Sequence, residues 1–209
     1  MTIRRGEPWG RTAPLPDGAP IASSNSELRQ AVTAQRDGAS RPEPIGVTGG
    51  DLWRVVGAPS GGARRLRSEG AHTAPIDVIG VQADGERLWA CVGVIARNSW
   101  WHGPAVAVMN ADLAGTWRVA PAAHPNDGRL HVLETGLDHP LLSLRDRLAA
   151  RRRLRTGAHL PHPAISVRRV ADAEFRFERP MALWLDGERV GKCRELDVAT
   201  VPDAVEIVF

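Results

Sequence analysis

The apolar positions in the first third of the chain predict a small α/β unit. Residues 1–20 are rich in proline and glycine, have no periodic apolar pattern and are expected to be irregular or extended. In Ser23–Val32, serine and asparagine precede apolar positions at helical spacing, which predicts the start of a helix. A short β run, Ile45–Thr48, leads through two glycines into the helical spacing of Leu52–Val56, which Gly57 ends. Strand, glycine turn and helix in succession are typical of an α/β unit.

The pattern changes after a loop rich in glycine, serine and arginine, and short apolar or alternating runs follow, separated by turn signals. Phe175 and Phe177 share one face of such a run while Glu174 and Arg176 share the other, as in a half-buried strand. The runs are 76–81, 88–96, 106–110, 117–120, 130–134, 164–170, 173–177, 181–185, 194–199 and 205–209. Many short strands joined by tight turns predict a β-sandwich or a related all-β domain.

A helix is predicted over Leu141–Leu154, between the two series of strands. Leu141, Leu144 and Leu148 form one stripe at helical spacing, and six arginines lie in Arg145–Arg155. Two interpretations of these arginines remain open. They form either a surface that docks on anionic lipid head groups or the solvated face of an amphipathic helix.

The composition indicates a globular protein and excludes several other classes. Of the 209 residues, 43% are hydrophobic and 24% are charged, the net charge is +3, and Lys192 is the one lysine. Cys91 and Cys193 are too few for a disulfide framework or a cysteine-rich metal site. No apolar run reaches membrane-spanning length, so we expect a cytoplasmic protein, with peripheral membrane contact as an alternative. Of Trp100 and Trp101, at least one is expected to fill the sandwich core.

Three segments have a composition that chemistry can use. Gly46–Arg54 lies at a strand-to-helix turn, where backbone N–H groups and the helix N-terminus favour an anion. Ala120–Leu130 contains Asn-Asp-Gly, a strong hairpin signal. In Leu183–Glu188, Asp186 and Glu188 project to one face of an extended segment, which suits metal contact or general-base work. Each segment also has a purely structural interpretation as a turn.

Taken in this order and spacing, the three segments resemble the diacylglycerol kinase-like lipid kinase family, over roughly residues 22–209. Thr48–Arg54 looks like the family's Gly-Thr-x-Asn-Asp-Phe-Ala-Arg segment, and Leu185–Glu188 matches its Asp-Gly-Glu motif. The other matching segments are Ile76–Val78, Val108–Asn110, Val119–Ala122, Asn126–Leu130 and Val201–Val205. In that family an α/β nucleotide domain precedes a β-sandwich, and the active site lies in the cleft between them.

The resemblance implies an α+β protein: a truncated α/β nucleotide-domain remnant, residues 1–74, followed by a β-sandwich domain of lipid kinase type, residues 75–209. It implies ATP- and Mg²⁺-dependent phosphoryl transfer to the hydroxyl group of a diacylglycerol or another lipid. Asp186 would act as the general base, Glu188 would help to organise Mg²⁺, and Asp127 would lie at a structural cation site. The implied nucleotide-binding residues are Ser23, Asn25, Thr48, Gly49, Gly50 and Asp51.

The chain departs from the family pattern at the loop that cradles the nucleotide phosphates. The family's Gly-Gly-Asp-Gly-Thr corresponds here to Ser23–Glu27, directly before the helix segment Leu28–Val32. No glycine remains there, Asn25 replaces the aspartate, and Glu27 replaces the threonine, so a carboxylate would face the polyphosphate. About twenty residues precede this loop, where the family carries several strand–helix units.

Two functions therefore remain open. One is a reduced lipid kinase that retains Asp186 and Glu188. The other is a catalytically degenerate member that binds a lipid or a protein partner. Homodimerisation through an exposed sheet edge or the tryptophan-rich surface is a further expectation. Nucleic-acid binding has no support beyond the charge and is not expected.

Overall fold

The computed structural model describes residues 8–38, 43–137 and 141–209. In this part of the chain the helices are α1 (Asn25–Asp37), α2 (Gly50–Val55), α3 (Gly62–Leu66) and α4 (Leu144–Arg153). The strands are β1 (Arg11–Thr12), β2 (Ile21–Ala22), β3 (Ile45–Val47), β4 (His72–Ala83), β5 (Glu86–Ala90), β6 (Gly93–Arg97), β7 (Ala105–Met109), β8 (Leu113–Ala114), β9 (Trp117–Arg118), β10 (Leu130–Thr135), β11 (Ser166–Val170), β12 (Asp172–Leu185) and β13 (Glu188–Val208).

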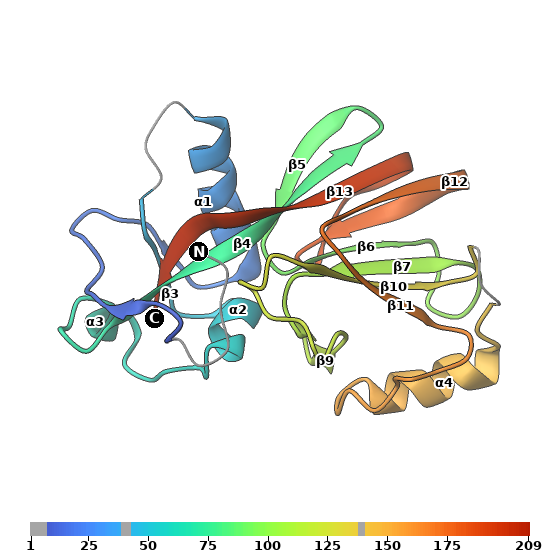
Figure 1. Ribbon diagram of the computed structural model, residues 1–209, viewed down its shortest axis with the longest axis horizontal. Coiled ribbons are helices and arrows are strands. Elements are labelled where there is room, and N and C mark those ends of the chain that lie inside the picture. Colours follow the sequence, from blue (N-terminus) through green and yellow to red (C-terminus); the bar gives the residue numbers. More distant parts are fainter. Residues whose placement is uncertain (1–7, 39–42, 138–140) are drawn as a thin grey trace.

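Eleven of these strands form one large, mostly antiparallel sheet. Eight of them follow the order β1-β4-β13-β12-β6-β7-β10-β11, and β2, β3 and β5 join the sheet beside this path. Strand β5 pairs with β4, and β8 and β9 form a separate two-stranded ribbon. The parallel pairs are β2 with β3 and β3 with the end of β13. Figure 1 shows the result: β4 and β13 run from the lobe that holds α1, α2 and α3 toward the lobe that holds β6, β7, β10, β11 and β12. The α+β class and the β-sandwich lobe are thus confirmed.

The two lobes share the long strands β4 and β13 rather than being joined by a linker. The predicted boundary between residues 74 and 75 falls inside β4. At its end, β13 lies between β4 and β3, with Ile207 opposite Ile45 in a parallel pair. The last residues of the chain therefore belong to the sheet of the α-helical lobe.

Three predicted strand boundaries are wrong. The runs 173–177 and 181–185 form one strand, β12, and the runs 194–199 and 205–209 form one strand, β13. A proline lies in each predicted break, and each break coincides with a register shift. Because a shift lets pairing resume after the proline, the strand continues. Conversely, the run 88–96 is divided between β5 and β6. At the break, the N–H groups of Cys91 and Val92 donate to the carboxylate of Asp186 instead of to a neighbouring strand.

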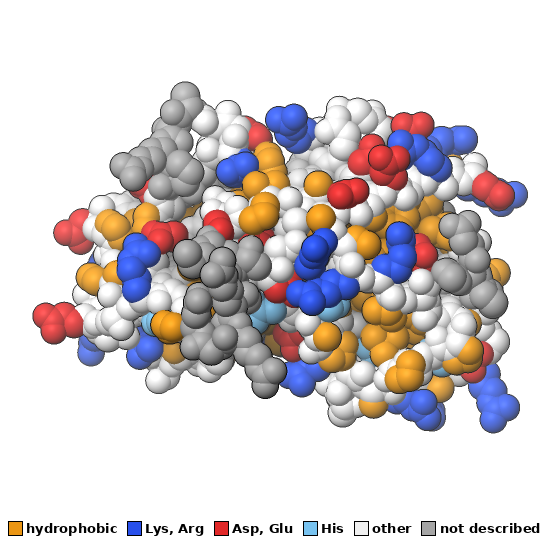
Figure 2. Space-filling model, in the orientation of Figure 1, with side chains coloured by type: hydrophobic (Ala, Val, Ile, Leu, Met, Phe, Trp, Pro, Cys, Tyr) orange, Lys and Arg blue, Asp and Glu red, His pale blue; other side chains and the backbone are white. Residues whose placement is uncertain are grey.

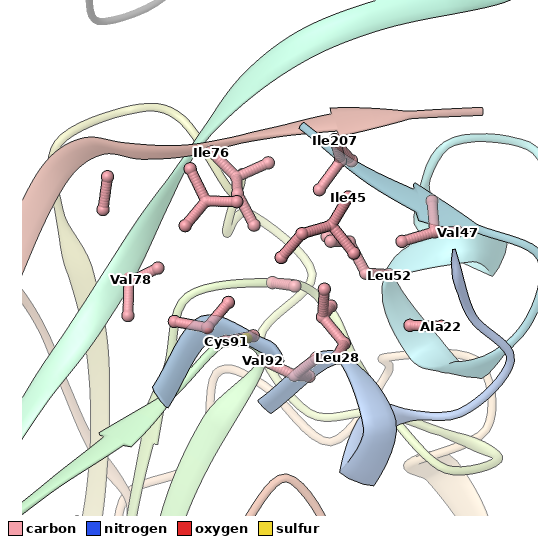
Figure 3. Packing of buried hydrophobic residues seen from close by; sticks show 14 of the residues in the cluster. Ala22, Leu28, Ile45, Val47, Leu52, Ile76, Val78, Cys91, Val92 and Ile207 are labelled. Carbon is pink, nitrogen blue, oxygen red and sulfur yellow. The ribbon is translucent and has the colours of Figure 1, made fainter. Parts of the chain in front are cut away.

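The predicted helix and strand of the first lobe are confirmed. Helix α1 begins after Ser24, whose hydroxyl accepts a hydrogen bond from the N–H of Glu27 at 3.2 Å. Its apolar residues pack with side chains of α2, β3, β4 and β13 into one core (Figure 3). Fully buried members include Leu28, Ile45 and Ile207. A second core fills the interior of the sandwich lobe and consists of buried side chains from the strands of the large sheet.

Helix α4 lies apart from both cores, below β6, β7 and β10 in Figure 1. Its residues confirm the predicted helix, but the leucine stripe faces solvent: Leu141, Leu144 and Leu148 are 55%, 57% and 43% exposed. The buried residue is Arg147, which donates to the carbonyl group of Leu142, just before the helix, and to that of Gly103, and the second bond ties the helix to the sheet lobe. In the described part of the chain no helix has both the length and the apolar character to cross a bilayer.

Candidate functional site

Three loops that are far apart in the sequence meet between the two lobes. The side-chain amide of Asn25, at the start of α1, donates to Asp51 Oδ2 at 2.8 Å and to the carbonyl oxygen of Asp186 at 3.4 Å. Its Oδ1 accepts from the N–H of Asp51 at 2.6 Å. Asn25 therefore bridges the loop before α1, the turn before α2 and the turn between β12 and β13.

The Asp-Gly turn between β12 and β13 aims a carboxylate at the break between β5 and β6. Asp186 and Gly187 have φ values of 52° and 90°, as a two-residue type I′ hairpin requires. Asp186 Oδ1 accepts from the N–H groups of Val92 at 2.7 Å and Gly93 at 3.1 Å, and Oδ2 accepts from Cys91 at 3.0 Å. With 0% of its side chain exposed, the carboxylate is enclosed by these donors.

An arginine provides the counter-charge for both carboxylates of the Asp-Gly-Glu motif. Burial raises the pKa of Asp186 to about 6, although the three N–H donors and the charge of Arg29 favour its ionised form. Arg29 Nε lies 4.0 Å from Asp186 Oδ2, and the guanidinium group also donates to Glu188. A hydrogen bond from Ser26 and the charge of Arg29 lower the pKa of Glu188. A guanidinium group therefore stands between the two residues predicted to handle the proton and Mg²⁺.

The loop expected to cradle the phosphates is packed directly against the turn before α2. A Cβ atom at Gly49 would collide with the carbonyl oxygen of Ser23, and one at Gly50 would lie 2.6 Å from Asn25 Oδ1. The N–H of Thr48, after β3, donates to a carbonyl group of β2 at 2.9 Å. The space and several of the backbone donors that a phosphate would need are thus used by the chain itself.

The side chains of these loops are engaged with one another as well. Glu27 Oε2 accepts from the N–H of Ser23 at 2.7 Å and from its hydroxyl at 2.8 Å, and these bonds lower the pKa of Glu27. The buried Asp51 accepts from the N–H of Gly115 at 2.8 Å and pairs with Arg54. The residues present do not fit a Mg·ATP phosphate site of the family's kind, because the cradle is filled and Glu27 would repel the phosphates.

Asp127 is engaged with two side chains. Arg169 donates to its Oδ2 at 2.9 Å, and His131 Nε2 lies 3.8 Å from the same oxygen. Burial opposes ionisation of Asp127, but the neighbouring His131 and the charge of Arg169 outweigh it and lower the pKa of Asp127. Within the described ranges, no three His, Cys, Asp or Glu side chains are grouped to hold a metal ion. The metal role of Asp127 stays a prediction.

A cavity of about 220 Å³ adjoins the junction of the three loops. It is lined by Asp51 and Asp186 together with Trp100, Trp117 and Trp184. This arrangement places the motif residues beside a largely apolar wall, so the space next to Asp186 suits an apolar or amphipathic molecule.

A second cavity, of about 160 Å³, lies between α4 and the strands β6, β7 and β10 and shares Trp100 and Trp117 with the first. The expectation that Trp100 or Trp101 fills the core is wrong, since they are 40% and 44% exposed. Both line this second cavity, where Arg97 stacks 3.3 Å from the ring centroid of Trp100. The two tryptophans therefore form part of a cavity wall instead of the sandwich core.

The sequence motifs did not identify Arg29, Arg97 or Trp184. Arg29 is the fifth helical residue of α1, and its place beside Asp186 depends on packing of α1 against a hairpin more than 150 positions away. Arg97 ends β6, and Trp184 lies on the adjacent β12.

Comparison with known proteins gives a family and a fold. Residues 78–209 match the family profile described as YegS C-terminal NAD kinase beta sandwich-like domain. A solved structure named "a putative diacylglycerol kinase" from Bacillus anthracis str. Sterne superposes with a TM-score of 0.67 at 11% identity, covering 90% of this chain and 77% of that chain. Another, named a diacylglycerol kinase from the same organism, gives 0.63 at 12%, covering 90% and 74%. No curated protein matches the sequence.

The structural matches are too low in identity to establish more than the fold, whereas the profile match covers well over half of the chain. It includes the strands from β5 to β13 and the Asp-Gly turn at Asp186. The chain belongs to the diacylglycerol kinase-like lipid kinase family, whose C-terminal domain is this NAD kinase-like β-sandwich.

Proposed function

We propose that this protein is a lipid-binding member of its family that does not use ATP. The observation that carries the proposal is the pair of adjoining cavities, which remain beside a phosphate cradle that the chain itself fills. The acyl part of the ligand lies against α4, and its polar end lies on the side of the 220 Å³ cavity that Arg97 and Trp184 line. The ligand is an amphipathic lipid, as the resemblance to lipid kinases suggests.

The lining of the 160 Å³ cavity supports an acyl chain. The residues that face it, with the tryptophans described above, are Ala107 of β7, Leu133 of β10, Ala150 of α4 and Leu154 at the end of that helix. Whole drug-sized ligands occupy roughly 300–1,000 Å³, so this volume suits a segment of one chain rather than a complete lipid. Because the exposed Arg151 of α4 also lines the cavity, the remainder of the acyl chain has a path outward.

Phosphoryl transfer is the alternative, and the family resemblance favours it. Two observations weigh against it: the Asp186 carboxylate is enclosed by three backbone donors, and the loop from Ser23 to Glu27 is occupied internally. A general base must reach the proton that it removes, and a nucleotide needs free donors for its phosphates. We therefore expect neither Mg·ATP binding nor label transfer from ATP to diacylglycerol.

Quenching of tryptophan fluorescence tests lipid binding directly. A monoacylglycerol with a dibrominated chain should quench the tryptophans that line the cavities, and its unbrominated analogue should not. Ala107→Phe fills the cavity and should abolish quenching, whereas Ala63→Phe on the exposed surface of α3 should leave it unchanged. Absence of quenching in the unmodified protein would overturn the proposal.

A thermal-shift titration separates the two functions. A ligand that binds only the folded protein raises its melting temperature, so the lipid should produce a shift and Mg·ATP should not. A saturable shift with Mg·ATP, together with transfer of labelled phosphate above an Asp186→Asn control, would establish the kinase instead.

We also propose that α4 docks on an anionic membrane surface from which the lipid enters. The exposed Leu141, Leu144 and Leu148 share α4 and its flank with the arginines of Arg145–Arg155. In Figure 2, hydrophobic and basic side chains stand next to each other over the region where α4 lies in Figure 1. An apolar stripe with basic neighbours is the pattern of helices that lie in a membrane interface.

A further inference from the structure

A basic hollow lies on the sandwich lobe, next to the cavities. Its volume is about 300 Å³, and Arg97, Arg189 and Lys192 line it together with Ala182 and Trp184. Asn98, the remaining lining residue, is engaged with backbone groups of β12. The hollow thus gathers three cations, including the chain's one lysine, and no carboxylate.

Sheet register explains why these side chains meet. Ala182 pairs with Lys192 and Trp184 pairs with Arg189 across β12 and β13. On the other side of β12, Leu183 pairs with Ala96, the residue before Arg97. A row across three strands therefore places the small Ala182 between two long basic side chains. The hollow is the space over Ala182 that a larger side chain would fill.

The cations of this hollow have no acidic partner. In the ranges that the structure describes, Arg97, Arg189 and Lys192 form no side-chain hydrogen bond or ion pair with another residue, and Arg97 is held by stacking on Trp100 and Trp184. Glu188, which precedes Arg189, is neutralised by Arg29. Two donors are buried without an acceptor, Arg97 Nε and Trp184 Nε1. Unpaired buried donors are costly, so an acceptor supplied by a ligand would stabilise the site.

Arg97 also links the hollow to the proposed lipid site. It lines the basic hollow, the 220 Å³ cavity and the 160 Å³ cavity, and Trp184 lines the first two. Burial lowers the pKa of Arg97 to about 10, which leaves the guanidinium charged at neutral pH. A molecule with an anionic head and an apolar tail could therefore contact both regions around one residue.

We propose that Arg97, Arg189 and Lys192 form a phosphate-binding site, and that the ligand of this protein is an acidic single-chain lipid whose phosphate they hold. This inference rests on the proposed lipid-binding function and names its ligand class. Planar guanidinium groups pair with phosphate oxygens by two hydrogen bonds, and Lys192 adds a point charge. The acyl chain extends past Trp100 into the cavity beneath α4.

Calorimetric titration with two lipids of the same chain tests the head-group requirement. Lysophosphatidic acid should bind at least about tenfold more tightly than monooleoylglycerol, because one charge-assisted hydrogen bond contributes at least the binding free energy of a tenfold change in affinity. Arg97→Gln, Arg189→Gln or Lys192→Gln should each reduce this preference, whereas Arg64→Gln on exposed α3 should not. Equal binding of the two lipids would overturn the phosphate site and leave the lipid-binding function standing. If neither lipid binds, both proposals fail.

Chemical labelling of Lys192 gives a second readout that does not depend on a variant. Because Lys192 is the one lysine, an amine-specific reagent modifies this side chain and the amino terminus, which peptide mass spectrometry distinguishes. Lysophosphatidic acid should protect Lys192 and monooleoylglycerol should not. Equal protection by glycerol phosphate or inorganic phosphate would support the anion site but overturn its connection to the acyl chain. No protection by any phosphate probe would overturn the site altogether.

Discussion

The carboxylate of Asp186 takes the place of a strand partner at the break between β5 and β6. The N–H groups of Cys91, Val92 and Gly93 point to it instead of to a neighbouring strand. Since buried N–H groups without an acceptor are costly, this one side chain lets the sheet turn from β5 into β6. The same three hydrogen bonds occupy the carboxylate, which is the reason that we do not expect Asp186 to act as a general base.

The raised pKa of Asp186 gives stability a pH dependence. Its value is about 6 in the folded protein and near 3.8 ordinarily, so between these values the folded state holds a proton that the unfolded chain has lost. The contribution of Asp186 to stability is full below about pH 4 and is lost as the pH rises through 6. The loss of unfolding free energy over this pH range that is due to Asp186 is roughly 3 kcal/mol.

Asp186→Asn should make the decline in unfolding free energy between pH 4 and 6 shallower, as measured by urea denaturation at each pH. A residual decline belongs to Asp77, whose pKa burial also raises to about 6. Asp172→Asn, at an exposed carboxylate, should leave the slope as it is. An unchanged slope in Asp186→Asn would contradict the assignment.

At the scale of elements, the loop before α1 and the turn before α2 are fitted to each other. Gly50 has φ of 84°, and a Cβ there would meet Asn25, whereas Gly57 has φ of 95° and open space around it. Gly50→Ala should therefore cost about 1–3 kcal/mol more of unfolding free energy than Gly57→Ala. The matched pair cancels the backbone strain, and urea denaturation measures the difference. Equal losses would mean that the two loops are not in close contact.

Helix α4 should bind vesicles that contain phosphatidylglycerol and not vesicles of phosphatidylcholine alone. Each arginine near an anionic surface contributes about 1 kcal/mol, so Arg152→Gln with Arg153→Gln should weaken co-sedimentation strongly. Leu144→Gln should weaken it with no loss of stability, because this side chain is 57% exposed. Binding should fall as salt is added. Salt-independent binding, or an equal effect of Arg64→Gln on α3, would contradict docking through α4.

Sequence reasoning reached the elements whose signals are local. The cap at Ser24 predicted α1, and Asp186-Gly187 predicted a tight turn, since a few adjacent residues decide each of them. The continuity of β13 was not predictable in the same way, because its pairing resumes after a proline only when β4 is in place. Arg29 was missed for a similar reason: its position on α1 is local, but its partner Glu188 is 159 positions away in the sequence.

For the whole molecule, dimerisation stays a prediction, with β11 as the exposed edge. This strand pairs with β10, and Val167 on it is exposed. Arg168 and Arg169 pair with Glu134 and Asp127 of the same chain, so their charge repels a second copy less than free arginines would. Light scattering should give twice 22.6 kDa, and Val167→Lys should shift the mass to the monomer. A monomer in the unmodified protein would contradict it.

The strands β4 and β13 should make the two lobes unfold as one unit. Ile207 is fully buried where β13 lies between β3 and β4, and the same strand pairs with β12 in the sandwich. Ile207→Ala removes buried methyl groups and should cost about 2–5 kcal/mol. Hydrogen exchange should then show loss of protection in β10 as well as in α1, because sub-global opening follows shared strands. Val190→Ala, on the exposed part of β13, should change neither. Loss of protection confined to α1 would mean that the two lobes unfold independently, although they share β4 and β13.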